Sequence, residues 1–245
     1  MWWIVVIVVV IILLLLVAIG FGARSAPRRD DDNHSINLPR VSNKESEPTF
    51  IPANDLAGMW GEEIVSNQLK SLLKRDEYLL TNLLIPLSNG HKTEIDCVLI
   101  SRKGIFCVET KKWMGHISGN NNDEYWYQEY DDVSLPTKRH KNPVKQNEAH
   151  CEALERILNT TLTVDNAVIF ADLEDESGIK SDFAFSVDSF IEFYNGLNDD
   201  YIFPNELEPL YRKLLCYVAT EKELEKHRRD VKRQYGDQDN WINYN

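Results

Sequence analysis

One predicted hairpin constrains the fold more than any other feature of this 245-residue chain. Alternating residues at 94–101 and 105–112 flank two basic residues, and this spacing predicts a β-hairpin with a two-residue turn. In that register Asp96 lies directly opposite Glu109. Side chains alternate between the two faces of a strand, so Lys111 projects on the same side as Glu109. The pattern therefore places two carboxylates and an ammonium group on one face of a sheet.

Two alternatives stay open on the sequence alone. Gly104 can end a three-residue loop with a bulge, which shifts the pairing by one residue and puts Thr110 opposite Asp96. The three polar groups can also form an exposed cross-strand ion cluster, which contributes only roughly a few tenths of a kcal/mol.

The chemistry of the three groups indicates a metal site. Facing carboxylates repel each other unless a cation lies between them, and hard oxygen ligands suit Mg²⁺ or Mn²⁺. Such an ion polarises a phosphoryl oxygen and lowers the pKa of a bound water, while a nearby ammonium group stabilises charge on a transferring phosphate. Metal-dependent phosphodiester hydrolases use this layout, an acid on one strand and acid-x-Lys on the next. We interpret Asp96, Glu109 and Lys111 as a candidate hydrolytic site.

The flanking segments predict a helix, three strands, a second helix and a last strand, in this order. Asn54 or Asp55 can cap the first helix, and its apolar residues repeat at helical spacing. Asn142 and Pro143 open the second helix. The expected ranges are 54–73, 78–85, 94–101, 105–112, 142–158 and 167–170.

These residues resemble the nuclease-related domain (NERD) family of the PD-(D/E)xK nuclease superfamily, over residues 54–172. The resemblance rests on GxxGE at 58–62, EIDxVLIS at 94–101, GIFxVETKxWxGxIxG at 104–119 and NPVxQNxxH at 142–150. It implies an α/β fold of the restriction-endonuclease kind, with a mixed central sheet, an α-β-β-β-α-β core and flanking helices. Ile95 stands where the superfamily's name places proline, which supplies no ligand.

The resemblance also implies roles for individual side chains. Asp96 and Glu109 look like ligands of Mg²⁺ or Mn²⁺, Lys111 looks like the catalytic lysine, and Glu62 looks like the first-helix acid that joins the metal site. Gln146 looks like the second-helix glutamine of the catalytic set. Considered alone, Glu62 can simply favour the helix dipole, and Gln146 can be an ordinary surface residue.

Aromatic and basic residues near the hairpin are candidates for nucleic-acid contact. Trp113 and the Tyr-Trp-Tyr run at 125–127 can stack on bases, although aromatic residues at strand alternation also form core. Basic residues at 138–141 can contact phosphates or form a solvated loop. The histidines lack the spacing of a zinc site, which favours surface or hydrogen-bonding roles. The candidate contact residues are Lys112, Trp113, Lys138, Arg139 and Lys141.

The N-terminus predicts a membrane anchor. Residues 2–19 are all apolar and no charge occurs before Arg24, so the run is long enough to span a bilayer. A cleaved signal peptide is the competing interpretation, but it requires a basic n-region and a shorter apolar segment. Arg24, Arg28 and Arg29 favour a cytoplasmic side after the span. We expect a single-pass anchor at 1–23, with the N-terminus outside and the following domain in the cytoplasm.

The rest of the chain divides into three expected parts. Prolines interrupt a polar stretch at 24–53, which is typical of a flexible linker. The nuclease-like domain is expected at 54–172, and a mostly helical extension at 173–245. The extension carries no assigned chemistry.

Charge and cysteine content bear on the partners. The net charge of −12 differs from that of a strong general DNA binder, which is usually basic. The four cysteines lack CxxC spacing, and free thiols suit a reducing cytoplasm, although the sequence leaves a disulfide open. We expect a membrane-anchored nuclease that cleaves DNA or RNA, with a protein partner as a further option. The alternative is an inactive nuclease-fold module that binds or signals at the membrane.

Overall fold

The computed structural model describes residues 53–173, 175–198 and 201–235, and the backbone alone at 53–57 and 235. The expected anchor at 1–23 and all but the last residue of the expected linker lie outside this part, so both stay predictions. Within the described ranges, no helix is long and apolar enough to cross a bilayer.

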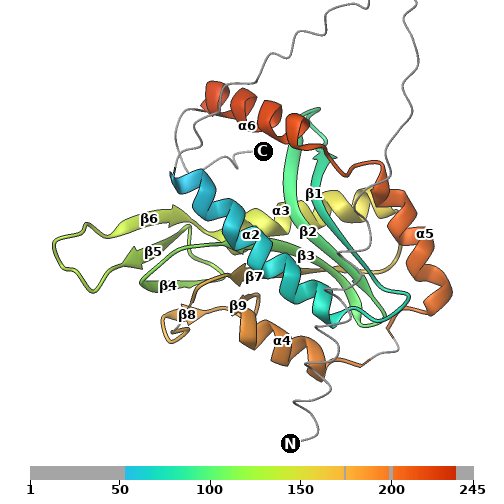
Figure 1. The fold of residues 1–245 in the computed structure, drawn as a ribbon, viewed down its shortest axis with the longest axis horizontal. Helices are drawn as coiled ribbons and strands as arrows, with labels where there is room; N and C mark the ends of the chain where they lie inside the picture. The colour runs from blue at the N-terminus through green and yellow to red at the C-terminus, as the bar shows by residue number, and fades with distance from the viewer. Residues whose placement is uncertain (1–52, 174, 199–200, 236–245) are drawn as a thin grey trace, which may run out of the picture. The chain divides into compact units, whose positions relative to one another are not determined.

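The centre of the fold is a five-stranded mixed sheet, and this architecture fits a nuclease-like α/β fold (Figure 1). The first three strands along the chain are antiparallel, and the last two run parallel to the third. Helix α2 (Ala53–Leu72) precedes the sheet and α3 (Pro143–Leu158) lies between its third and fourth strands in sequence, as expected. In spatial order the strands are β1 (Tyr78–Pro86), β2 (Lys92–Ser101), β3 (Gly104–Lys111), β7 (Val164–Phe170) and β9 (Ala184–Ser186).

The β2–β3 hairpin has the predicted two-residue turn rather than the bulged alternative. Ser101 pairs with Gly104, and the same register continues to Cys97 and Val108. The paired ladder ends there, one position before Asp96 would meet its partner. Beyond the ladder the two strands are still joined by a side-chain hydrogen bond, in which the Asp96 carboxylate accepts from the Thr110 N–H at 2.7 Å.

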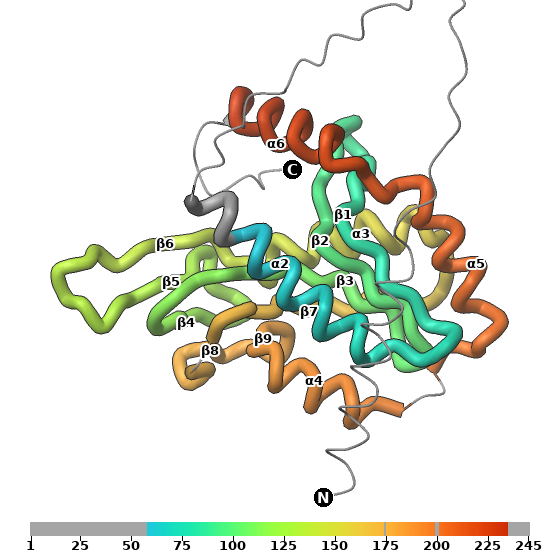
Figure 2. The backbone as a smooth tube through the Cα atoms, in the orientation of Figure 1, coloured from blue at the N-terminus to red at the C-terminus, as the bar shows by residue number. Residues whose placement is uncertain are grey.

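A smaller sheet is formed mainly by the segment between β3 and α3, and one short strand that follows β7 completes it (Figure 2). Trp126 is fully buried there, with its ring 6.2 Å from that of Phe170, so this aromatic residue of the 125–127 run is core. Gly119 gives it room, because a Cβ at this position would lie 2.3 Å from the indole ring. The strands are, in spatial order, β6 (Lys138–Lys141), β5 (Tyr125–Glu129), β4 (His116–Asn120) and β8 (Ile179–Lys180).

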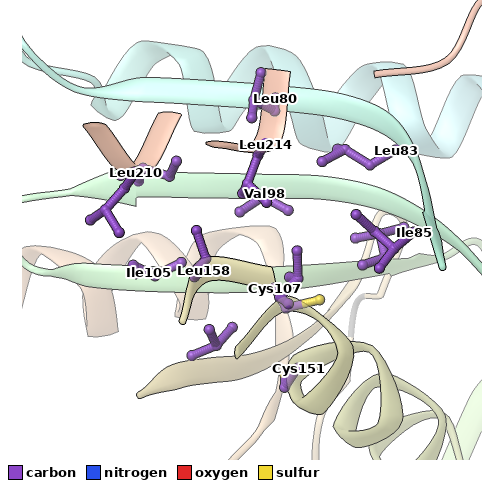
Figure 3. Close-up of a cluster of buried hydrophobic side chains, with 14 of the residues drawn as sticks. Leu80, Leu83, Ile85, Val98, Ile105, Cys107, Cys151, Leu158, Leu210 and Leu214 are labelled. Carbon is purple, nitrogen blue, oxygen red and sulfur yellow. The ribbon is translucent and has the colours of Figure 1, made fainter. Parts of the chain in front are cut away.

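Two apolar clusters cover the two faces of the main sheet. On one face, residues of β1, β2 and β3 such as Val98 pack against α3 and α5 (Pro204–Leu215), as Figure 3 shows. On the other, residues such as Leu99 pack against α2 and α4 (Val187–Gly196). Adjacent residues at 97–100 of β2 therefore face opposite cores, which explains the uninterrupted apolar run there.

Several element ends differ from the expectations. Helix α2 already includes Ala53, so Asn54 and Asp55 lie within the helix instead of preceding it. In the extension, the Ser186 side chain caps helix α4. Helix α5 ends at Leu215, and Val218 bridges to β1.

The C-terminal helix α6 (Glu221–Tyr235) is highly charged. Its sequence shows scarcely any apolar stripe, yet Leu224 and Val231 are both buried. The two residues are seven apart and share one face of the helix, so α6 is docked through a narrow apolar seam.

The packing of Trp126 gives a stability prediction. Gly119→Ala should lower the free energy of unfolding by about 1–3 kcal/mol, because the new methyl group overlaps the indole ring. Urea denaturation measures the change. Gly58→Ala in α2 is the matched control: nothing lies within 4 Å of its Cβ, and alanine favours helix by about 0.5–1 kcal/mol. A Gly119→Ala protein as stable as Gly58→Ala would contradict the packing argument.

Candidate functional site

Four elements of the described structure bring the predicted polar residues together. Strand β3 carries Glu109 and Lys111, β2 carries Asp96, and α2 carries Glu62. The Lys111 Nζ donates to Glu109 Oε1 at 2.6 Å, and the Glu109 side chain is buried. The carboxylate of Asp96 is close enough to those of Glu109 and Glu62 that both raise its pKa.

Gln146 completes a triangle with Glu109 and Lys111. Its Nε2 donates to Glu109 Oε1 at 2.8 Å, and its Oε1 accepts from Lys111 Nζ at 3.3 Å. The Asn142 side chain caps α3 by accepting from the Val144 N–H at 2.9 Å, which fixes where the first turn begins. Gln146 therefore reaches the site from a fixed helix start and is not an ordinary surface residue.

Glu62 reaches the site because α2 packs very close to the end of β3. A Cβ at Gly61 would lie 3.1 Å from the Cβ of Lys112, so glycine permits this approach. Burial raises the pKa of Glu62 from 4.5 to about 6; Arg228 opposes the rise, and Glu94 and Glu109 add to it. Burial is also the largest cause of the raised pKa of Asp96. These carboxylates lie in a shared, partly dehydrated environment.

Beneath the site, two buried polar residues of α3 support Glu109 and its strand. His150 Nε2 and Thr93 Oγ1 are 2.9 Å apart, and His150 Nδ1 lies 3.5 Å from Glu109 Oε2. Burial lowers the pKa of His150, which favours the neutral ring. The Asn147 Nδ2 donates to the Cys107 carbonyl oxygen and to Asn166 Oδ1, at 2.8 Å each. Asn147 thereby joins β3 to β7.

The segment that holds this geometry matches a known family. The family model of the nuclease-related domain (NERD) matches residues 57–171. This segment is similar to that family, and we refer to residues 57–171 as the nuclease-related domain. The uncharacterized protein pXO1-01 of Bacillus anthracis is 26% identical over 176 residues, covering 69% of this chain and 80% of that protein. No solved structure matches the chain.

The candidate nucleic-acid contacts of the nuclease-related domain fall into two groups. Near the site, Trp113 stacks on the His140 ring at 4.1 Å between centroids, and Lys112 lies over the Trp60 ring at 5.7 Å. On β6, Lys138 and Arg139 are exposed, and the guanidinium of Arg139 lies 4.2 Å from the Tyr125 ring centroid. Lys141 is half-buried on the same strand. Trp113 is therefore packed within the protein on at least one ring face.

Two residues of the site had no role in the sequence interpretation. Arg228 of α6 forms a two-point ion pair with Glu94, which lies two residues before Asp96 on β2. The Nη2 of Arg228 is also 3.9 Å from Glu62 Oε1. The pair joins residues 134 positions apart, so no local pattern signals it. The buried polar positions of α3 carried a weak signal, since Asn147 and His150 lie within the NPVxQNxxH block.

The donor chemistry of the nuclease-related domain suits a hard divalent cation. Glu62, Glu94, Asp96 and Glu109 supply oxygen ligands only, and two bases of the described segments, Lys111 and Arg228, form ion pairs with acids of this set. When ionised, the four acids exceed the two bases by two negative charges, which a divalent ion neutralises. Among the described residues, no three His, Cys, Asp or Glu side chains already lie close enough together to hold a metal. The residues thus fit such an ion in type and charge.

The raised pKa of Glu62 predicts a pH-dependent stability of the metal-free protein. Folding favours protonated Glu62, so this stabilisation is present below pH 4.5 and is lost as the pH rises through about 6. Glu62→Gln should therefore exceed the wild type in unfolding free energy by roughly 1–2 kcal/mol above that range, and by less below it. Thermal melts in EDTA across the range measure the difference. The neighbouring exposed variant Glu63→Gln should follow the wild-type curve, and an equal effect of both variants would refute the assignment.

Proposed function

We propose that this protein is a metal-dependent nuclease that hydrolyses phosphodiester bonds of DNA, with RNA as an alternative substrate. One observation carries the proposal: within a nuclease-related domain, Lys111, Glu109 and Gln146 hydrogen-bond to one another beside Asp96 and Glu62. An exposed ion cluster would leave Glu109 in water, whereas this carboxylate is buried and receives donors from both β3 and α3.

The residues have distinct roles in this proposal. Asp96, Glu109 and Glu62 would hold Mg²⁺ or Mn²⁺, which supplies Lewis-acid activation and a water of lowered pKa. Lys111 keeps its ammonium group fixed against Glu109, where it offsets charge that develops on the phosphoryl oxygens. Gln146 fixes the positions of the Lys111 and Glu109 side chains relative to each other, because its amide hydrogen-bonds to both. Lys112, Trp113, Lys138, Arg139 and Lys141 are the proposed nucleic-acid contacts.

The cellular setting is part of the proposal. The apolar residues 2–19 anchor the chain in a membrane as a single pass, and Arg24, Arg28 and Arg29 retain the nuclease-related domain on the cytoplasmic side. All four cysteines, which lie in described segments, are free thiols, which is consistent with a reducing compartment.

The second candidate function is an inactive binding or signalling module on the same fold. The net charge of −12 favours it, because a nucleic-acid binder is usually basic. In this case the Lys111–Glu109 pair would be a purely structural contact that takes up no metal.

Cleavage tests the proposed catalytic residues. The full chain in detergent should cleave DNA with Mg²⁺ or Mn²⁺, and Asp96→Ala or Lys111→Ala should lower the rate by about 100-fold or more. Lys70→Ala, at an exposed position near the far end of α2, should keep the wild-type rate. Equal cleavage by the wild type and both site variants would show that the activity belongs to a contaminant.

Metal binding separates the two candidate functions without any substrate. Mn²⁺ at about 100 times its dissociation constant should stabilise the wild type by about 2.7 kcal/mol, because the ion binds the folded state. Asp96→Asn should abolish most of this gain in thermal melts with and without Mn²⁺. Asp188→Asn, an exposed acid on α4, should retain it. A wild type that gains no stability from either ion would favour the inactive module.

A further inference from the structure

The C-terminal helix α6 lies outside the matched segment 57–171, yet it reaches the candidate site. Figures 1 and 2 show it crossing the end of the main sheet where β2 begins, towards the N-terminal half of α2. Contacts from α6 to both elements confirm this placement, because Arg228 pairs with Glu94 of β2 and approaches Glu62 of α2.

The guanidinium of Arg228 is held in one orientation by Glu94. Its Nε donates to Glu94 Oε2 at 3.0 Å, and its Nη2 donates to Glu94 Oε1. This two-point pairing fixes the plane of the group as well as its position. The Nη2 of Arg228 also lies 3.9 Å from Glu62 Oε1. The hydrogen bond to Glu94 raises the pKa of Arg228. The charges of Glu62 and Asp96 add to the rise. The guanidinium therefore lies beside carboxylates proposed to hold the metal.

The apolar seam of α6 keeps Arg228 facing the body of the protein. The buried residues Leu224 and Val231 lie four positions before and three positions after it, which places all three on one face of the helix. This seam docks the helix through burial of apolar surface. A partly exposed ion pair adds little docking energy, so docking alone gives weak reason for an arginine at this place.

Arg228 also retains the capacity to bind another anion. Its side chain is 40% exposed, whereas that of Glu94 is 15% exposed. In the part of the chain that the structure describes, its Nη1 makes no hydrogen bond. A planar guanidinium with free donors at the edge of a site matches the geometry of a phosphate group.

We propose that Arg228 is a phosphate-binding residue of the nuclease, oriented by Glu94, so that α6 contributes to the substrate site. The inference rests on the proposed function, because the phosphate is that of the nucleic-acid substrate. The competing interpretation is that the Arg228–Glu94 pair only docks α6.

Breaking the pair from each end separates these interpretations. Arg228→Gln and Glu94→Gln remove the same ion pair, so docking alone predicts equal effects. Phosphate binding predicts unequal ones: Arg228→Gln should weaken DNA binding about tenfold, whereas Glu94→Gln should change affinity much less. In Glu94→Gln the guanidinium remains, and the loss of a repelling carboxylate offsets the looser orientation of Arg228. Arg228→Lys should retain the charge contribution but lose part of the two-point geometry.

The measurement is fluorescence anisotropy of a labelled DNA duplex with the full chain in detergent and EDTA, where metal-dependent cleavage is excluded. Between about 50 and about 200 mM salt, Arg228→Gln should lower the slope of log affinity against log salt by about one, with no such loss in Glu94→Gln or Arg228→Lys. Thermal melts of the two glutamine variants establish whether α6 docking is affected equally.

The outcomes also separate this inference from the proposed function. If the wild type binds or cleaves DNA and the two glutamine variants have equal affinity, salt slope and KM, the Arg228 assignment is wrong and the nuclease proposal stands. If the wild type neither binds DNA in EDTA nor cleaves it with Mg²⁺ or Mn²⁺, both are overturned. A loss confined to kcat in Arg228→Gln, with KM and binding unchanged, would also overturn phosphate binding as its role.

Discussion

The register of the β2–β3 hairpin is the constraint on which the site depends. A slip of one residue would send Asp96, or Glu109 with Lys111, to the opposite face of the sheet. The two strands are buried on both faces, by α3 and α5 on one side and by α2 and α4 on the other. Residues 97–100 of β2 and 105–108 of β3 enter the two cores alternately, so both cores enforce the register that the two-residue turn begins.

Helix α3 positions a second set of polar side chains relative to the hairpin. Its cap at Asn142 and its buried Asn147, which binds groups of both β3 and β7, fix the helix along its axis and around it. Gln146 and His150 then approach the same carboxylate, that of Glu109, from one helix face. Gln146 and Asn147 hydrogen-bond to groups of the sheet, whereas the buried Nδ1 of His150 makes no hydrogen bond among the described residues. A buried polar atom without a partner is costly, so the position of His150 beside Glu109 is one that the surrounding structure must hold.

The sequence predicted what depends on neighbouring residues. The period of two, the turn between the strands and the Asn142–Pro143 helix start were enough for the hairpin, for α3 and for the grouping of Asp96, Glu109 and Lys111. The choice of Glu62 and Gln146 depended on the family resemblance. Local pattern did not reveal which aromatic residue of 125–127 is buried, because alternation leaves the choice of face to the surrounding fold. It also missed the Arg228–Glu94 pair, since an ion pair between distant segments leaves no trace in spacing.

The acidic character of the chain and its nuclease-like site are compatible on electrostatic grounds. Glu62 and Asp96 have raised pKa values because burial and neighbouring acids disfavour their charged forms, so the metal-free site is strained by its own charge. A bound cation would remove this repulsion, which would add to the affinity for the cation. The same repulsion lowers the stability of the metal-free fold. A surface salt-bridge cluster would show the reverse, with carboxylates whose pKa falls on pairing. The raised pKa values of Glu62 and Asp96 are therefore those of buried acids that lie near one another, and a bound cation would favour their charged forms.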